Sequence, residues 1–246
     1  MRGRRVRRAD DSKHDHYCYN RGLTAHNRAT IGYVAPFLVF VSLMVLDRSL
    51  QLPDAIVYPV RFAIVTLLIL TVARPYLSLR PSRPLASILL GVAVFLIWIG
   101  PDKVFGPEYR HFWLFENSVM GKAQSSIAEP LRHNFLFLVL RFATAAVLVP
   151  ILEELFWRGW MSRWLINPQF QKVALGAYTA MSFWIVAALF ASEHGPFWEV
   201  GLIAGILYNW WLIRTKNLAD CILAHAVTNA ILSAYVLLTD QWQYWS

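Results

Sequence analysis

Charged residues and cysteines are both scarce in this sequence. Asp, Glu, Lys and Arg make up 15% of the 246 residues, against about 25% in an ordinary soluble domain. This shortage of charge argues against a soluble globular protein. Of the two cysteines, Cys18 falls in a polar tail and Cys221 in an apolar segment, so we expect neither a disulfide between them nor redox chemistry. The sequence also lacks the internal repeat that marks the inverted halves of many transporters.

Apolar and aromatic residues take the place of the missing charge. Hydrophobic residues make up 57% of the chain, the mean hydropathy is +0.42, and 11 Trp and 10 Tyr are present. Because helices satisfy their own backbone hydrogen bonds in lipid, this composition predicts an all-α fold, a polytopic transmembrane helix bundle with about seven to eight crossings. The apolar segments are 30–46, 55–72, 85–100, 135–166, 173–190, 200–213 and 218–238. Between them, residues 101–132 mix polar and aromatic side chains, which predicts an interfacial helix or a loop.

A basic tail at residues 1–28, which we expect to be disordered, precedes an integral membrane domain at residues 29–246. The tail lacks the compact apolar region and the small-residue cleavage site of a signal peptide, so the first apolar segment is expected to be an uncleaved anchor. The spacing of His14, His16 and Cys18 is compatible with a metal site. Incidental histidines in a polar tail explain this spacing better.

The basic residues predict the orientation of the chain. Sixteen of the 23 Lys and Arg residues fall in the tail and in alternate loops, on the side that the positive-inside rule assigns to the cytoplasm. They are Arg2, Arg4, Arg5, Arg7, Arg8, Lys13, Arg21, Arg28, Arg74, Arg80, Arg83, Arg158, Arg163, Lys172, Arg214 and Lys216. We therefore expect a cytoplasmic N-terminus, an external C-terminus if there are seven crossings, and a location in a bacterial plasma membrane. The net charge of +8 reflects this topology and attraction to membrane lipid, and it needs no nucleic acid partner.

Three polar motifs interrupt the apolar segments. They are Glu-Glu-Leu-Phe-Trp-Arg at 153–158, Phe-Ala-Ser-Glu-His at 190–194 and His-Ala-Val-Thr-Asn at 225–229. Ionisable side chains at the depth of a bilayer cost roughly 2.5–3.5 kcal/mol each on insertion scales, so they mark functional sites by default. The motifs therefore predict an active site inside the membrane.

The first motif offers a carboxylate for acid–base chemistry. On a helix, Glu154 and Arg158 are four residues apart and face each other, so the guanidinium neutralises one carboxylate. Glu153 points about 100° away and is left without a partner on its own helix. A poorly solvated carboxylate of this kind is suited to take a proton from water and later return it. A helix-end ion pair beside a solvated glutamate is the alternative, non-catalytic interpretation.

The other two motifs offer hydrogen-bond donors. His225 and Asn229 are four residues apart and project from one face of the last apolar segment. Their N–H groups, converging on one point, would stabilise the oxygen charge that develops when an amide is attacked. Hydrogen bonding between helices is the alternative. His194 directly follows an apolar segment and precedes Gly195 and Pro196, which end it, so it would orient the same water as the first glutamate or cap its helix.

Taken together and in this order, the motifs Glu-Glu-x-x-x-Arg, Phe-x-x-x-His and His-x-x-x-Asn resemble those of the CAAX protease and bacteriocin-processing (CPBP, or Abi) family of intramembrane glutamate-type proteases. The resemblance covers residues 135–238, and no motif residue is missing. It implies a helical membrane hydrolase, a peptidase that cuts a protein or peptide substrate without a metal or other cofactor. The second glutamate and the arginine of the first motif, Glu154 and Arg158, would support the site.

The resemblance also implies the catalytic roles. Glu153 and His194 would activate the attacking water, while His225 and Asn229 would form the oxyanion hole. A zinc-dependent membrane protease remains a chemical alternative, because the glutamate and the two histidines are a plausible ligand set, although the sequence has no His-Glu-x-x-His motif. A non-catalytic membrane immunity or scaffold protein, in which the same groups hold helices together, is the alternative from another functional class. A transporter is a third.

The long apolar segment at 135–166 raises a geometric difficulty. It would extend about 48 Å as a helix, against a bilayer core of roughly 30 Å. Simple alternation of crossings places Glu153 near the cytoplasmic end of this segment and His194 near the outer end of the next, too far apart to share a water. Pro150 can kink or divide the segment. A crossing shifted toward 146–166 would lower the glutamate into the bilayer, within reach of both histidines.

Overall fold

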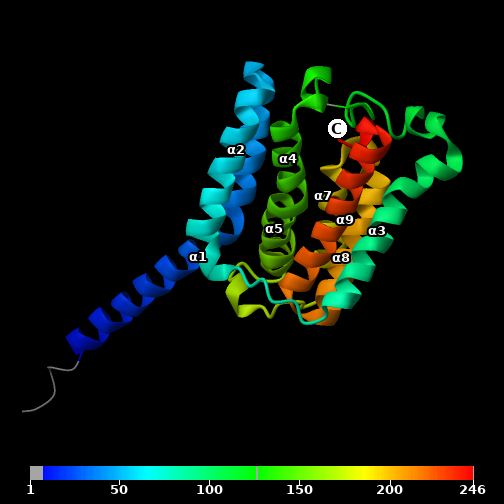
Figure 1. The fold of residues 1–246 in the computed structure, drawn as a ribbon. Helices are drawn as coiled ribbons and strands as arrows, with labels where there is room; N and C mark the ends of the chain where they lie inside the picture. The colour runs from blue at the N-terminus through cyan, green and yellow to red at the C-terminus, as the bar shows by residue number, and fades with distance from the viewer. Residues whose placement is uncertain (1–7, 126, 246) are drawn as a thin grey trace, which may run out of the picture.

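The computed structural model describes residues 8–125 and 127–245, and every regular element among them is helical apart from one isolated bridge between Asn117 and Gly121. The prediction of an all-α fold is confirmed. The α-helices, shown in Figure 1, are α1 Arg8–Leu50, α2 Asp54–Leu68, α3 Pro84–Phe105, α4 Phe135–Ala143, α5 Val149–Glu153, α6 Ser162–Trp164, α7 Ala180–Ser192, α8 Trp198–Thr215 and α9 Leu218–Thr239.

Within the described residues, five helical segments are long and apolar enough to cross a membrane. They are His26–Asp47, Asp54–Tyr76, Pro84–Phe105, Phe135–Trp164 and Leu218–Thr239. Helix α7 has 13 residues, about 20 Å, which is shorter than the bilayer core. It begins at Ala180 and not at 173 as expected, because Gly176 adopts a φ of +74° and the Thr179 side chain caps the helix by accepting a hydrogen bond from Ser182 N.

Helix α1 begins well before the expected membrane segment. It runs from Arg8, so residues 8–28 are helical where the composition predicts disorder. Within this stretch the sequence has no proline and one glycine, so nothing breaks a helix that continues from the apolar part. Residues 1–7, and the side chains of the suggested metal site in the tail, lie outside the described residues. The division between tail and membrane domain stays a prediction.

The overlong segment forms one helix that contains two π-helical stretches. Helices α4, α5 and α6 continue one another through Thr144–Leu148 and Glu154–Met161. The first stretch ends just before Pro150, whose ring and missing N–H are poorly accommodated in a regular α-helix. The wider π-helical turn before Pro150 therefore accommodates the proline, and the helix continues through this position without a break.

Helices α3 and α9 pack closely side by side (Figure 1). Gly91 of α3 permits this approach, because a Cβ added there would lie 2.4 Å from the carbonyl oxygen of Ala224. The Thr228 hydroxyl of α9 donates a hydrogen bond to the Gly91 carbonyl (2.9 Å). Backbones that approach over a small residue and exchange hydrogen bonds are typical of helix packing in membranes.

A carboxylate from α9 holds the start of α3. Asp220, with 0% of its surface exposed, accepts hydrogen bonds from Ser82 N (3.1 Å), Ser82 Oγ (2.5 Å), Arg83 N (2.8 Å) and Ser87 Oγ (3.1 Å). Because the first N–H groups of a helix have no partner within the helix, this carboxylate caps α3 and fixes the connection before it against α9.

The chain between α3 and α4 is a loop with two 3₁₀ turns, Pro107–His111 and Glu129–His133. Arg110 ties this loop to the bundle. Its Nε donates to Asp102 Oδ1 (2.6 Å), and its Nη1 donates to Glu199 Oε1 (2.5 Å) and to the Pro196 carbonyl (2.9 Å). The loop lies at the same end of the bundle as the start of α4 and the end of α9 (Figure 1).

Candidate active site

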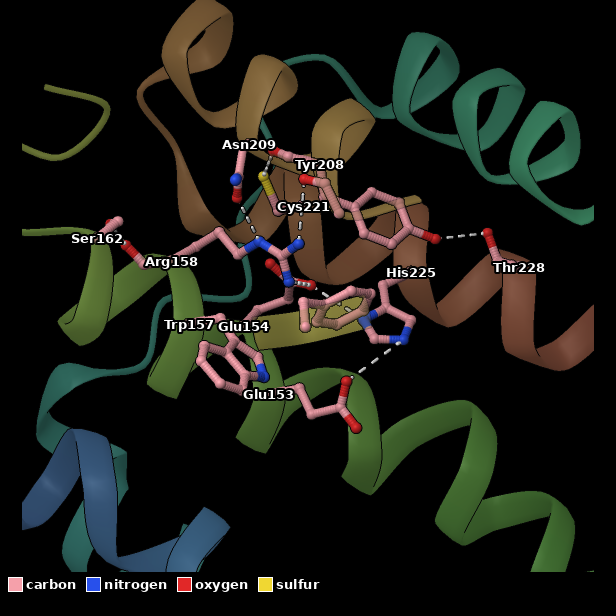
Figure 2. Close-up of polar contacts among 12 residues, drawn as sticks. Glu153, Glu154, Trp157, Arg158, Ser162, Tyr208, Asn209, Cys221, His225 and Thr228 are labelled. Carbon is pink, nitrogen blue, oxygen red and sulfur yellow. Dashed lines mark hydrogen bonds and ion pairs between the residues drawn. The ribbon is translucent and has the colours of Figure 1, made fainter. Parts of the chain in front are cut away.

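The three polar motifs come together around one cavity of about 510 Å³. Glu153 reaches it from the end of α5, His194 from the turn after α7, and His225 and Asn229 from α9. The structure thus brings all four predicted catalytic residues to one cavity, from three segments that are distant in the sequence. Figure 2 shows the polar contacts around the first and third motifs.

The predicted pair of Glu154 and Arg158 is present and has no exposed surface. Arg158 Nη1 donates to Glu154 Oε1 at 3.1 Å, and both side chains are 0% exposed. The same guanidinium donates from Nε to Asn209 Oδ1 (3.0 Å) and from Nη2 to the Gly205 carbonyl (3.4 Å), and it lies 4.3 Å from the centre of the Phe190 ring. Helices α7 and α8 therefore fix the arginine, and the arginine fixes the carboxylate.

His225 is oriented by this supporting pair. Its Nδ1 lies 3.0 Å from Glu154 Oε1, and because a carboxylate oxygen accepts hydrogen bonds, Nδ1 carries a proton. The imidazole stacks on the ring of Tyr208, with 5.1 Å between ring centres. Its Nε2 points to the other glutamate, 4.0 Å from Glu153 Oε2, as Figure 2 shows. The histidine therefore turns one nitrogen to the supporting carboxylate and the other to the candidate base.

Glu153 presents a carboxylate with unused hydrogen-bonding capacity. Its side chain is 13% exposed, and its buried Oε2 has no hydrogen-bond partner among the described residues. The two adjacent glutamates point apart, as their helical spacing predicts and as Figure 2 shows: Glu154 pairs with Arg158, and Glu153 lines the cavity. A water molecule in the cavity would find an acceptor there.

His194 is held in a single orientation beside Glu153. Its Nδ1 lies 2.7 Å from the Phe190 carbonyl, so Nδ1 carries the proton and Nε2 keeps its lone pair. Burial lowers the pKa of this imidazole to about 4, which keeps it neutral at physiological pH. Gly201 leaves room for the ring, because a Cβ added there would lie 3.1 Å from His194 Cγ. The short α7 ends beside Glu153, which resolves the geometric difficulty posed by the sequence.

Asn229 is anchored to the long helix. Its Nδ2 donates to the carbonyl of Ala145 (2.9 Å), which lies in the first π-helical stretch. The side-chain amide has two N–H groups, so this contact uses one and leaves the other for the cavity. The π-helical stretch thus contributes to the site by supplying the carbonyl that orients the amide.

Glu193 lines the same cavity, and the motif pattern predicts no role for it. Its Oε2 accepts a hydrogen bond from Trp157 Nε1 (3.0 Å). Although the side chain remains partly exposed, loss of water around the carboxyl raises its pKa to about 7, while the Trp157 hydrogen bond and the Arg158 charge act in the opposite direction. In the sequence, the feature that could have indicated a role for Glu193 is its position directly before the motif histidine His194.

A second hollow joins the cavity from the side of α1. It has a volume of about 370 Å³, and Glu153, Glu193 and His194 line it as well. Its other wall is entirely apolar and comes from α1. That wall consists of Phe37, Phe40, Val41, Met44 and Val45. The carboxylates of the site therefore lie at the junction of a polar cavity and an apolar groove.

The zinc alternative requires Glu153, His194 and His225 to converge on one point. Within the part of the chain that the structure describes, no three His, Cys, Asp or Glu side chains are grouped to hold a metal ion. The two histidines turn their Nδ1 atoms to the Phe190 carbonyl and to Glu154. Metal-ligating histidines make the same contacts through the ring nitrogen that does not bind the metal, so both Nε2 atoms are left free and chelation is the test of the zinc alternative.

A family model described as Rce1-like, type II CAAX prenyl endopeptidase, matches residues 135–231. The matched residues contain all three motifs, and the resemblance predicted from those motifs is confirmed. No curated protein and no solved structure matches the chain. At the level of the family, the match supports a membrane endopeptidase of the CAAX protease type, and the apolar helices support an integral membrane protein.

Proposed function

We propose that this protein is an intramembrane endopeptidase that uses a glutamate and two histidines, without a metal, to add water to a peptide bond. The observation that carries the proposal is the convergence of Glu153, His194, His225 and Asn229 on one cavity. The family match supports the same type of reaction. The substrate is a protein or peptide that reaches this cavity from the surrounding membrane or from water.

Activation of water begins at Glu153. A water bound between this carboxylate and the Nε2 lone pair of His194 has acceptors for both of its hydrogens. The carboxylate takes one proton, and the remaining hydroxide attacks the carbonyl carbon of the peptide bond. The Glu153 side chain lines the cavity and is 13% exposed, so a water in the cavity can reach this carboxylate.

The oxygen of the attacked carbonyl becomes negatively charged in the tetrahedral intermediate. The second N–H of Asn229 and a proton on Nε2 of His225 are the donors that would stabilise this charge. Nε2 donates only when both ring nitrogens carry a proton, and Glu154, which is hydrogen-bonded to Nδ1, then lies beside the charged ring. The ion pair with Arg158 fixes this carboxylate in place.

Collapse of the intermediate completes the reaction. The proton taken from water passes from Glu153 to the leaving nitrogen, the C–N bond breaks, and the carboxylate is restored. The products are a new carboxyl group on one fragment and a new amine on the other. Both hydrogens of the water are thus accounted for, one on the new amine and one on the new carboxyl group.

The decisive experiment replaces Glu153 with glutamine, which keeps the size of the side chain and removes the base. Purified wild-type and Glu153→Gln proteins are incubated in detergent with quenched fluorogenic peptides, with and without a prenylated C-terminal cysteine. We expect cleavage by the wild type, also after prolonged chelation, and none by the variant at an unchanged thermal unfolding temperature. Glu129→Gln, in the loop before α4, is the matched control and should cleave normally.

Two results would overturn the proposal. Retention of more than a small fraction of the activity in Glu153→Gln would remove this residue as the base. Loss of wild-type activity on chelation, with recovery on adding zinc, would reassign the carboxylate and the histidines as metal ligands.

A further inference from the structure

The cavity of the candidate active site opens toward one end of the bundle. Beyond the motif residues, its lining comes from the loop after α3, the first half of the long helix and the C-terminal end of the chain. Lys122, Gln124, Arg141, Ser233 and Tyr244 represent these parts. The side chain of Lys122 is 67% exposed, so this end of the cavity meets solvent. It is the end at which Figure 1 shows the loop and the C-terminus.

The opposite end of the bundle is closed beneath the site. The cavity stops at Glu154 and Arg158, which are 0% exposed. The next residue, Gly159, is packed so tightly against α1 that an added Cβ would lie 2.7 Å from Tyr33 Cε1. Phe37 stacks on Phe156 with 4.2 Å between ring centres. A substrate therefore has no path to the site from this end.

Charge is distributed very unevenly between the two ends. The connections at the closed end are 74–83, 165–179 and 216–217, and those at the open end are 51–53, 106–134, 193–197 and 240–246. The closed-end connections carry five Lys and Arg and no Asp or Glu, whereas the longer open-end connections carry three Lys and Arg and five Asp and Glu. Short connections rich in Lys and Arg are retained in the cytoplasm.

The N-terminal tail adds to the same asymmetry. A hydrogen bond of 3.1 Å joins His26 of α1 to Gln171 in the connection at 165–179, so α1 enters the bundle at the closed end. The sequence that precedes this point carries seven Lys and Arg between residues 2 and 21. The closed end thus collects most of the basic residues of the chain.

We infer that the cavity opens to the non-cytoplasmic face of the membrane, and that the substrate is a peptide segment presented on that face. The second statement rests on the proposed peptidase function, and the first does not. Substrates would be exported or externally supplied polypeptides, or the external ends of other membrane proteins. The tails of cytosolic proteins would face the closed end.

Cysteine labelling tests the sidedness without any need for activity. In a full-length chain with Cys18 and Cys221 replaced by serine, Gln124→Cys places a thiol at the mouth of the cavity, and Ser78→Cys is the matched control at the closed end. Both positions are exposed. Intact bacterial cells that express each variant are treated with a membrane-impermeant maleimide, before and after permeabilisation. Ser125→Cys provides a second position at the mouth.

We expect Gln124→Cys and Ser125→Cys to be labelled in intact cells, and Ser78→Cys only after permeabilisation. The reverse pattern, with position 78 labelled from outside and the mouth protected, would overturn the inference. A parallel assay adds an impermeant peptide substrate to right-side-out and inside-out membrane vesicles, and cleavage is expected in the right-side-out vesicles. Absence of cleavage even in detergent would reject the proposed peptidase while leaving the labelling result to decide the sidedness.

Discussion

Glu153 and Glu154 are adjacent in the sequence but differ in their surroundings, because they project from different sides of the same helix. Glu154 is enclosed with Arg158 and His225, and its Oε1 receives a hydrogen bond from each. Glu153, one position earlier and about 100° around the helix, lines the cavity. The spacing in the sequence predicts this division. It does not predict that Glu153 would be 4.0 Å from His225, because that distance depends on how α9 packs.

Asn229 provides a test of the oxyanion hole at the residue scale. We expect Asn229→Ala to lower kcat on the order of 10²–10³-fold, the usual loss for one oxyanion donor, with little change in KM. The control is Ser233→Ala, one turn further along α9 and in the same cavity wall, which should keep most of the activity. Steady-state kinetics on a cleaved peptide provides both constants. A variant with normal kcat and a raised KM would place Asn229 in substrate binding instead.

Glu193 predicts a pH dependence of stability. Its folded-state pKa, raised to about 7 by loss of water around the carboxyl, lies above its ordinary value, so the folded state binds more protons than the unfolded state between these values. The associated stability is present at low pH and is lost as the pH rises through 7. The Glu193→Gln side chain does not titrate, so the variant does not lose this stability. The difference in unfolding temperature, variant minus wild type, should therefore become more positive from pH 5 to pH 8.

Glu116 provides a control of opposite sign for that measurement. A hydrogen bond with His111 lowers the pKa of this partly buried glutamate, so its contribution to stability is lost as the pH falls. The unfolding temperature of Glu116→Gln relative to wild type should therefore increase toward acid pH. Equal differences at pH 5 and pH 8 for Glu193→Gln would show that its carboxyl is not perturbed.

At the scale of elements, hydropathy predicts where the apolar helices lie. It does not predict the turn before α7 or the two π-helical stretches. All seven apolar segments contain a helix. The late start of α7 and its short length depend on the turn at Gly176 and the cap at Thr179. Both residues lie inside an apolar segment, where hydropathy alone does not indicate a helix start. The two π-helical stretches have no periodicity signal of their own. The anchoring of Asn229 on Ala145 could not be predicted without them.

Asp220 is the element-scale interaction with the clearest energetic consequence. Its carboxylate accepts hydrogen bonds from two backbone N–H groups and two hydroxyls at the start of α3. Hydrogen bonds to a charged group contribute roughly 1.5–3 kcal/mol, and the donors left behind are poorly solvated. We expect Asp220→Ala to lower the free energy of unfolding in mixed micelles by about 3 kcal/mol. Asp240→Asn, after the end of α9, keeps a residue that tolerates the left-handed backbone at this position and should change it by less than about 0.5 kcal/mol.

At the scale of the whole molecule, the sequence predicts the orientation of the bundle but not the position of its opening. Orientation is encoded in basic residues that can be counted along the chain. The opening depends on which end of the bundle is filled, and this follows from contacts such as Phe37 on Phe156 and Tyr33 against Gly159. These residues lie more than a hundred positions apart, so no local pattern reveals their packing.

The loop at 106–134 joins α3 to α4 and forms part of the mouth of the cavity. Arg110 holds this loop against the bundle. This side chain is 5% exposed and pairs with Asp102 and Glu199, which are also largely covered. Removing one partner from a buried pair leaves an uncompensated charge, at a cost of about 3 kcal/mol or more. We therefore expect Arg110→Met to release the loop and to lower both the unfolding temperature and kcat/KM.

Trypsin cleavage after Lys122 measures this release directly, because that residue lies in the cavity wall that the loop provides. The Arg110→Met protein in detergent should be cut at this site at least tenfold faster than the wild type. A triple variant that adds Asp102→Asn and Glu199→Gln should be cut more slowly than Arg110→Met, because both uncompensated carboxylates are then neutral. If the loop were instead held by its aromatic contacts alone, all three proteins would be cut at the same rate. A rise in cleavage with a matching fall in kcat/KM would show that the loop, although distant in sequence from every motif, is part of the working site.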